Sequence, residues 1–264
     1  MADEHLFGRT VLVVLAHPDD ESLACGGTLA RLADLGAHIV LLCASRGENG
    51  SVSDPALVAN GDLASVRSQE LHDAAKVLGI AEVLIFEHPD GDLRWADVPQ
   101  FHVEIVLAIQ KYKPDCVITF AEDGLYWHLD HIGVHERTYT AVRSFGPHAP
   151  PLYYVTMRHG AMHEIVDAAV ANGLAPGANP FNIEPDAFGD YAQPPTFVVD
   201  VRPWVPRKLA ALRCHRTQIG PDNPFHHITD EQARRLLGVE QFRRSPLEAG
   251  WDSVIEQLGE RVAS

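Results

Sequence analysis

The chain has 264 residues, of which 46% are hydrophobic and 22% charged, a balance typical of a globular α/β protein with a sizeable core. Its formal net charge of −15, with no run of lysine or arginine, argues against nucleic acid and anionic membranes as partners. The N-terminal segment MADEHLFGRT lacks an apolar stretch, and no run of about 18 apolar residues occurs, so we expect no signal peptide, no membrane span and a cytoplasmic location.

Short apolar runs rich in β-branched residues alternate with helical patterns in the first part of the chain. The apolar runs predict buried parallel strands at 11–16, 38–44, 82–87, 116–121 and 152–157. The segments between them predict helices at 21–36, 63–79, 99–113 and 131–145. This alternation predicts an α/β fold: a doubly wound, Rossmann-like, mostly parallel sheet with helices on both faces.

The rest of the chain predicts a small C-terminal strand and helix portion. The segment 171–195 is rich in Pro, Gly and Asn and is expected to be a long loop. A strand at 196–201, a helix that starts at Pro203 and a charged helical tail follow. We therefore expect one domain over 1–264, with a Rossmann-like core at about 9–160 and a C-terminal portion at about 161–264. The sequence leaves open whether the chain forms a homo-oligomer.

Histidine and carboxylate side chains follow two of the predicted strands. The sequence His17-Pro18-Asp19-Asp20 comes after the first strand, and His128-Leu129-Asp130-His131 comes after the fourth. In a sheet of order 3-2-1-4-5 these two strands are neighbours where the strand order reverses, and ligands bind beyond their carboxyl ends. We therefore expect the two loops to converge on one crevice.

Neutral imidazoles and a carboxylate form the ligand set that a catalytic zinc ion uses, with the fourth position left for water. His17 and Asp20 are three residues apart at a strand-to-helix turn, so both can bind one ion while Asp19 points elsewhere. A carboxylate outside the ligand set can act as a general base toward water. A histidine across the site could protonate a leaving group or polarise a carbonyl.

Each motif alone is also typical of a helix N-terminus. Asp19 or Asp20 would serve as an N-cap, and Glu21 would suit the helix dipole. Three carboxylates in one loop repel one another without a cation, however, and two such motifs are predicted at the same sheet edge. The metal interpretation is therefore favoured.

The motif AHPDDE, together with the downstream HxDH, resembles the LmbE/PIG-L family of zinc-dependent N-acetylglucosaminyl deacetylases. This family includes the deacetylases of mycothiol and bacillithiol biosynthesis and the mycothiol-conjugate amidase. The resemblance covers most of the chain, from the first strand to about residue 220. It implies one Zn2+ per chain held by His17, Asp20 and His131, and sequence does not exclude Fe2+ on the same ligands.

The resemblance also implies catalytic roles beside the ion. Asp19 matches the general base, and His128 matches the histidine that stabilises the tetrahedral intermediate or acts as an acid. Asp130 matches the neighbour that orients His128. Tyr126 stands where some members place a mobile tyrosine that helps to hold the oxyanion, although a packed loop aromatic is the alternative. Leu129 stands where the family commonly has proline.

Further segments resemble the family's substrate contacts. The arginine of RSQEL, Arg67, is expected to reach the substrate, and a surface ion pair with Glu70 is the alternative. Glu48 in ASRGENG is expected near the sugar, and Asp90 in HPDGDL is expected to accept sugar hydroxyls, although both segments also suit plain turns. His215 in LRCHRTQ is expected to approach the site, with a cap or core role as the alternative.

The resemblance implies hydrolysis of an acetamido group on an amino-sugar small molecule, which releases acetate and a free amine. The alternative with the same chemistry is an amidase acting on a larger thiol-sugar conjugate or antibiotic glycoside. A nicotinamide or flavin oxidoreductase is disfavoured, because acidic HPDDES replaces GxGxxG after the first strand. A metallophosphoesterase usually needs more ligands, and a non-catalytic zinc-binding protein has no use for Asp19 or His128.

Overall fold

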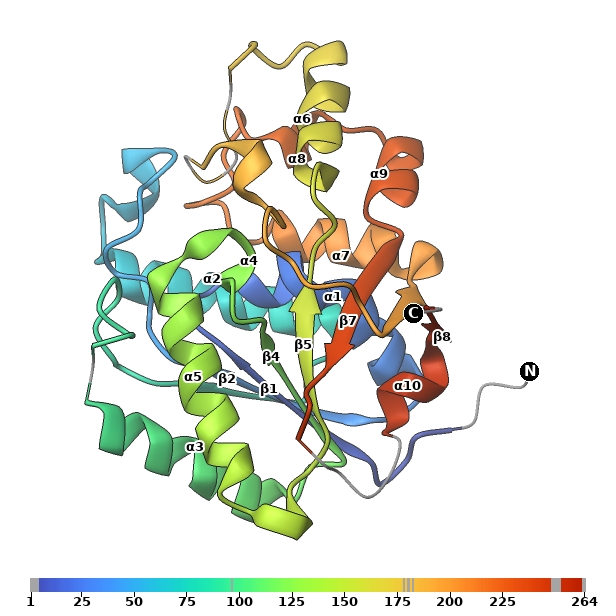
Figure 1. Ribbon diagram of the computed structural model, residues 1–264. Helices are drawn as coiled ribbons and strands as arrows, with labels where there is room; N and C mark the ends of the chain where they lie inside the picture. Colours follow the sequence, from blue (N-terminus) through green and yellow to red (C-terminus); the bar gives the residue numbers. More distant parts are fainter. Residues whose placement is uncertain are drawn as a thin grey trace.

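The computed structural model describes residues 5–95, 97–177, 179, 181, 183–247 and 253–262. The described residues form an eight-stranded sheet in the order β3-β2-β1-β4-β5-β7-β6-β8, with helices on both sides (Figure 1). The strands are β1 (Thr10–Leu15), β2 (His38–Cys43), β3 (Glu82–Ile85), β4 (Cys116–Phe120), β5 (Leu152–Thr156), β6 (Phe197–Asp200), β7 (Val239–Arg244) and β8 (Glu260–Arg261).

The first five strands are parallel and follow the predicted order, so the predicted fold class is confirmed. Strand β1 lies in the middle of this part, where Val11 is in register with Ile39 of β2 and with Cys116 of β4. Both faces of β1 are buried, which explains its continuous apolar sequence. Because β1 and β4 are neighbours, the loops that follow them leave the same edge of the sheet.

Two groups of helices cover the two faces of the sheet, as Figure 1 shows. On one side α1 (Asp20–Asp34) and α2 (Leu63–Leu78) pack with α7 (Val205–Leu212), and on the other α3 (Val98–Tyr112) packs with α5 (Leu129–Arg143). The four helices predicted in the first part of the chain are therefore present. The shorter helices are α4 (Gly124–Trp127), α6 (Ala161–Ala171), α8 (Pro224–His227), α9 (Asp230–Leu236) and α10 (Val254–Leu258). None of the described helices combines the length and the apolar character that a membrane span requires.

The C-terminal portion differs from the prediction of a helical tail. Strand β7 pairs antiparallel with both β5 and β6, and β8 pairs with β6. The sequence VEQFRR alternates, so that Glu240 and Phe242 are buried, and Phe242 stacks on Phe197 with ring centroids 5.4 Å apart. The pattern was hidden because the charged Glu240 is buried while the apolar Val239 is exposed. Helix α6 was also not predicted.

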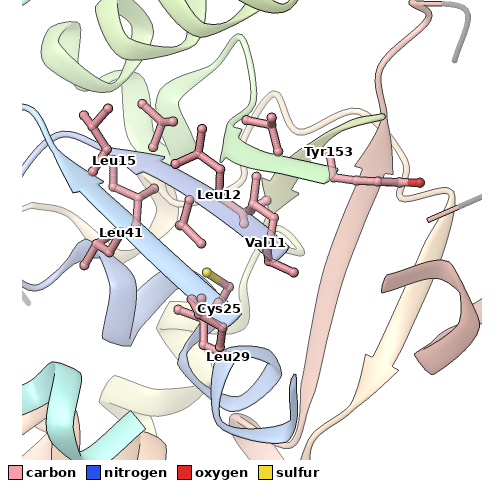
Figure 2. Close-up of a cluster of buried hydrophobic side chains, with 14 of the residues drawn as sticks. Val11, Leu12, Leu15, Cys25, Leu29, Leu41 and Tyr153 are labelled. Carbon is pink, nitrogen blue, oxygen red and sulfur yellow. The ribbon is translucent and has the colours of Figure 1, made fainter. Parts of the chain in front are cut away.

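The largest group of buried side chains surrounds β1 (Figure 2). Val11, Leu12 and Leu15 of β1 pack beside Leu41 of β2 and Leu29 of α1, and all five are at most 1% exposed. A second apolar cluster joins α6, α7, α8 and α9 at one end of the molecule. These two cores fix the carboxyl ends of β1 and β4 and the chain segments around them.

Candidate active site

A cavity of about 250 Å³ has walls made of residues that follow β1, β2, β3 and β4. It is lined by seven residues that the sequence predicts for the site, namely His17, Asp19, Asp20, Arg67, Asp90, Tyr126 and His128. The remaining lining residues were not predicted and are the polar or small residues Asn49, Gly50, Ser51, Gly91 and Gln218 and the apolar residues Leu23, Phe181 and Ile183. The cavity therefore has a polar side and an apolar side.

The three predicted metal ligands come together at the wall of this cavity, which His17 and Asp20 line. One ligand atom each of His17, Asp20 and His131 lies within 4.8 Å of the others, and all three residues are buried. Nε2 of His131 is 3.2 Å from Oδ1 of Asp20 and 3.3 Å from Nδ1 of His17. A second group, His17 with His128 and Asp130, meets the same distance limit and shares His17. The described residues thus provide a His/Asp/His set that could hold a metal ion.

Hydrogen bonds on the outer nitrogens orient both imidazoles of this set. Nε2 of His17 lies 3.0 Å from Oδ2 of Asp130 and 3.1 Å from Oδ1 of Asp90, so Nδ1 faces the other two ligands. Nδ1 of His131 donates to the carbonyl oxygen of Gly124 at 3.1 Å, which leaves Nε2 free to face inward. Partners of this kind fix the ring and tautomer of metal-binding histidines.

Asp130 was expected to orient His128, but its carboxylate holds His17 instead. The carboxylate is completely buried and also accepts the backbone N–H groups of Gly91 at 2.7 Å and Leu93 at 2.9 Å. His128 is the N-cap of α5, where its Nδ1 accepts the backbone N–H of Asp130 at 3.2 Å. Burial alone would raise the pKa of Asp130, but the hydrogen bond from His17 lowers it.

Asp19 occupies the N-cap position of α1 without acting as a side-chain cap. Its φ of 119° lies in a region that residues other than glycine rarely adopt, and such strain is often found at functional sites. The backbone N–H donates to Glu21 at 3.1 Å, and the carboxylate accepts from Arg67 at 3.1 Å. Burial raises the pKa of Asp19 to about 7, although the charge of Arg67 opposes this shift. The carboxylate faces the cavity and is not part of the His/Asp/His set.

Arg67 is a buried residue that ties three segments together. Its guanidinium donates to the carbonyl oxygens of Gly47 at 2.8 Å and Pro18 at 2.7 Å as well as to Asp19. A Cβ at Gly47, where φ is 66°, would collide with this guanidinium, so the turn requires glycine. Arg67 makes no ion pair with Glu70, because Glu70 accepts two hydrogen bonds from Thr217.

His128 and Tyr126 also line the cavity. Burial lowers the pKa of His128 to about 3, so its imidazole is neutral. Tyr126 packs against Phe188 with centroids 4.6 Å apart and against His131 at 5.2 Å. Among the residues that the structure describes, no partner is recorded for the Tyr126 hydroxyl, and burial raises its pKa well above the usual value.

Two residues expected at the substrate lie elsewhere. Glu48 is exposed and is not among the described residues that line the cavity, because its carboxylate accepts the backbone N–H of Asp90 at 3.0 Å. His215 is completely buried behind the site, with Nε2 2.8 Å from Glu21. Asn49, which follows Glu48, and Gln218, three residues after His215, reach the cavity instead.

Comparison with known proteins shows which family the chain resembles. The family model PIG-L, described as GlcNAc-PI de-N-acetylase, matches residues 12–142. A 1D-myo-inositol 2-acetamido-2-deoxy-alpha-D-glucopyranoside deacetylase of Thermobispora bispora is 30% identical over 266 residues, covering 89% of this chain and 87% of that protein.

Two solved structures share the fold at lower sequence identity. The N,N'-diacetylchitobiose deacetylase from Pyrococcus horikoshii has a TM-score of 0.61 at 23% identity, covering 90% of this chain and 84% of that one. GalB, a 4-carboxy-2-hydroxymuconate hydratase from Pseudomonas putida, has a TM-score of 0.62 at 20% identity, covering 92% and 99%. Because one structure is named a deacetylase and the other a hydratase, the fold alone does not determine the reaction.

Proposed function

The chain belongs to the PIG-L family of deacetylases, and we propose that it hydrolyses the N-acetyl group of a glucosamine-containing small molecule, releasing acetate and a free amine. The observation that carries this proposal is the convergence of His17, Asp20 and His131 next to a carboxylate that is outside the set, Asp19. A curated relative acts on an acetamido sugar linked to inositol, which supports an amino-sugar substrate.

The donor set fits a catalytic zinc ion, since it consists of two imidazoles and one carboxylate with their outer atoms already hydrogen-bonded. We propose one Zn2+ per chain on His17, Asp20 and His131, and Fe2+ could use the same ligands. A zinc ion bound there supplies Lewis acidity, which polarises a carbonyl oxygen and makes water a nucleophile near neutral pH.

Asp19 is proposed to take the proton of the attacking water. Its carboxylate faces the cavity, and Arg67 holds one of its oxygens. Because the backbone of Asp19 is fixed by Glu21, the carboxylate stays near one position during the reaction. The same group can then pass the proton to the departing amine, as a general acid–base catalyst does.

His128 is proposed to stabilise negative charge on the amide oxygen rather than to transfer a proton. Its Nδ1 accepts a backbone N–H, so in the neutral ring Nε2 carries the proton and can donate a hydrogen bond. The Tyr126 hydroxyl lines the same side and is proposed as a second donor. Sugar hydroxyls are proposed to hydrogen-bond to Asn49, Ser51, Asp90 and Gln218. Glu48 holds Asp90 in place, and His215 holds Glu21 in place.

The test is a screen for acetate release. The panel contains N-acetylglucosamine, its oligomers, its inositol and malate glycosides, and acylated antibiotics, with an aryl phosphate as a control for phosphatase activity. We expect acetate from at least one acetamido sugar and no phosphate from the control. If no amide in the panel is hydrolysed by protein that contains its metal, the proposal is wrong.

A further inference from the structure

Two exposed aromatic side chains belong to segments that line the cavity, although neither ring is itself a lining residue. Trp127 is 51% exposed and stands between Tyr126 and His128, which both line the cavity. Tyr191, from the long segment after α6, is 63% exposed and contacts Trp127 with ring centroids 5.2 Å apart and an interplanar angle of 71°. We call these two side chains the aromatic platform.

The backbone under the platform is strained. Leu125 and Trp127 both have positive φ values, 66° and 63°, although neither is glycine. The conformation is held by Asp123, whose side chain accepts the N–H of Leu125 at 3.2 Å and whose carbonyl accepts the N–H of Trp127 at 2.8 Å. Because of this strained turn, Trp127 is exposed while its neighbour Tyr126 packs against Phe188. Strain and an exposed indole both cost free energy, which suggests a use for the ring.

The segment that carries Tyr191 is hydrogen-bonded to the segment that carries Trp127. The backbone N–H of Gly189 donates to the carbonyl oxygen of Leu125 at 2.8 Å, two residues before Tyr191. Gly189 has a φ of 72°, and a Cβ there would collide with the carbonyl oxygen of Met157, so glycine is required. The contact between Trp127 and Tyr191 is therefore built by two segments that are far apart in the sequence.

The two segments that carry the platform also supply most of the apolar side of the cavity. Leu23, Tyr126, Phe181 and Ile183 line this side, and Tyr126 is adjacent in sequence to Trp127. The polar lining residues that suit sugar hydroxyls, such as Asn49, Ser51 and Gln218, come from other segments. A substrate that fits both sides has a polar acetamido sugar and an apolar extension.

We propose that the platform binds an aromatic ring carried by the substrate beyond the acetylated sugar, so that this chain prefers aryl glycosides of N-acetylglucosamine to inositol glycosides. A third aromatic ring can pack edge-to-face against either ring of such a pair. This inference rests on the proposed deacetylase function, and it names the class of group that the enzyme accepts next to the sugar.

The test compares phenyl, cyclohexyl, inositol and methyl glycosides of N-acetylglucosamine with the metal-containing full-length protein. The first three carry a six-membered ring that is aromatic, apolar or polar. We expect kcat/KM to be highest for the phenyl glycoside, by about tenfold over the inositol glycoside, mainly through KM. Tyr191→Ala and Trp127→Gly remove this preference while the methyl glycoside is turned over as before. Trp95→Ala is the matched control, since Trp95 is 67% exposed and, unlike Trp127, is not flanked by described residues that line the cavity.

Calorimetric titration of the same glycosides into the metal-containing Asp19→Asn variant, in which hydrolysis is expected to be slow, makes the comparison independent of turnover, so that a failure of the deacetylase proposal is seen separately. Glycine at position 127 suits the positive φ, and Tyr191→Ala changes a segment remote from the metal ligands. The inference is overturned if the inositol glycoside binds as tightly as the phenyl glycoside. It is equally overturned if Tyr191→Ala and Trp127→Gly keep the phenyl preference, or if Trp95→Ala loses it.

Discussion

The site has a buried side, where His17 and Asp130 each make several hydrogen bonds, and an exposed side, where the rings of Trp127 and Tyr191 are more than half exposed. A change in the buried cluster leaves a charged or polar group without its partner, which is costly. A change in an exposed ring removes a contact surface and leaves the sheet intact. The two sides therefore have different tolerance to substitution.

This difference separates reaction from specificity. The side chains proposed to bind the metal and to catalyse the reaction are each held by several hydrogen bonds. This suits a reaction that requires fixed geometry. Trp127 and Tyr191, which are proposed to bind the group beyond the sugar, lie on segments outside the sheet. They can be substituted at little cost to stability. Related chains could then keep the buried cluster and differ at the platform. The following predictions probe the boundary between the two sides.

The largest effect is expected from His131→Ala. The substitution removes one of three proposed ligands, so metal content is expected to fall from about one ion per chain to near zero and acetate release to the uncatalysed background. Elemental analysis and the acetate assay measure both. His135→Ala is the control on the same helix, because His135 also donates from Nδ1 to a carbonyl oxygen but lies outside the set. Unchanged metal content in His131→Ala contradicts the assignment.

Asp19→Asn is expected to lower kcat by about 10²–10⁴-fold while the metal is retained. Asparagine has nearly the same shape as aspartate and cannot take a proton from water. Asp62→Asn is the control, because Asp62 is the N-cap of α2 and its side chain does cap the helix. Loss of metal in Asp19→Asn would make Asp19 a ligand, and full activity would place the base elsewhere.

Asp130→Asn is expected to weaken metal binding by about 10–100-fold, because the amide no longer offers His17 and two backbone N–H groups a full set of acceptors. Competition with a chelator of known affinity measures the change. Glu104→Gln removes the carboxylate of another histidine pair, His88 with Glu104 at 2.6 Å, and is expected to leave metal binding unchanged. If Asp130→Asn binds the metal as tightly as the unmodified chain, Asp130 does not position His17.

The parallel strands and the predicted helices were accessible from sequence because each depends on a local pattern, and the His/Asp/His set was implied by the resemblance of two short motifs. A buried apolar run reports a central strand, and the spacing of His17 and Asp20 reports a strand-to-helix turn. Strand β7 was missed because its buried Glu240 is charged and pairs with Lys208 of α7, a partner that the local sequence does not reveal.

The rest of the site depends on how separate segments meet, which a local pattern does not contain. The turn at Gly47 sends Glu48 toward the backbone of Asp90 and turns Asn49 to the cavity, a difference of one residue. His215 turns inward to Glu21, so Gln218 takes the place expected for it. The platform likewise requires a contact between Trp127 and Tyr191 that neither segment predicts alone.

The smallest effect is expected from Tyr126→Phe, at the boundary between the two sides. The ring packs against Phe188 and His131, so phenylalanine keeps the packing and removes only the hydroxyl. One hydrogen bond to a developing negative charge corresponds to about a tenfold loss in kcat with KM nearly unchanged. Tyr112→Phe is the control, because that hydroxyl bonds Glu82 outside the cavity. Unaltered turnover would show that His128 stabilises the charge without Tyr126, and a loss of metal would show that the Tyr126 hydroxyl supports His131 instead.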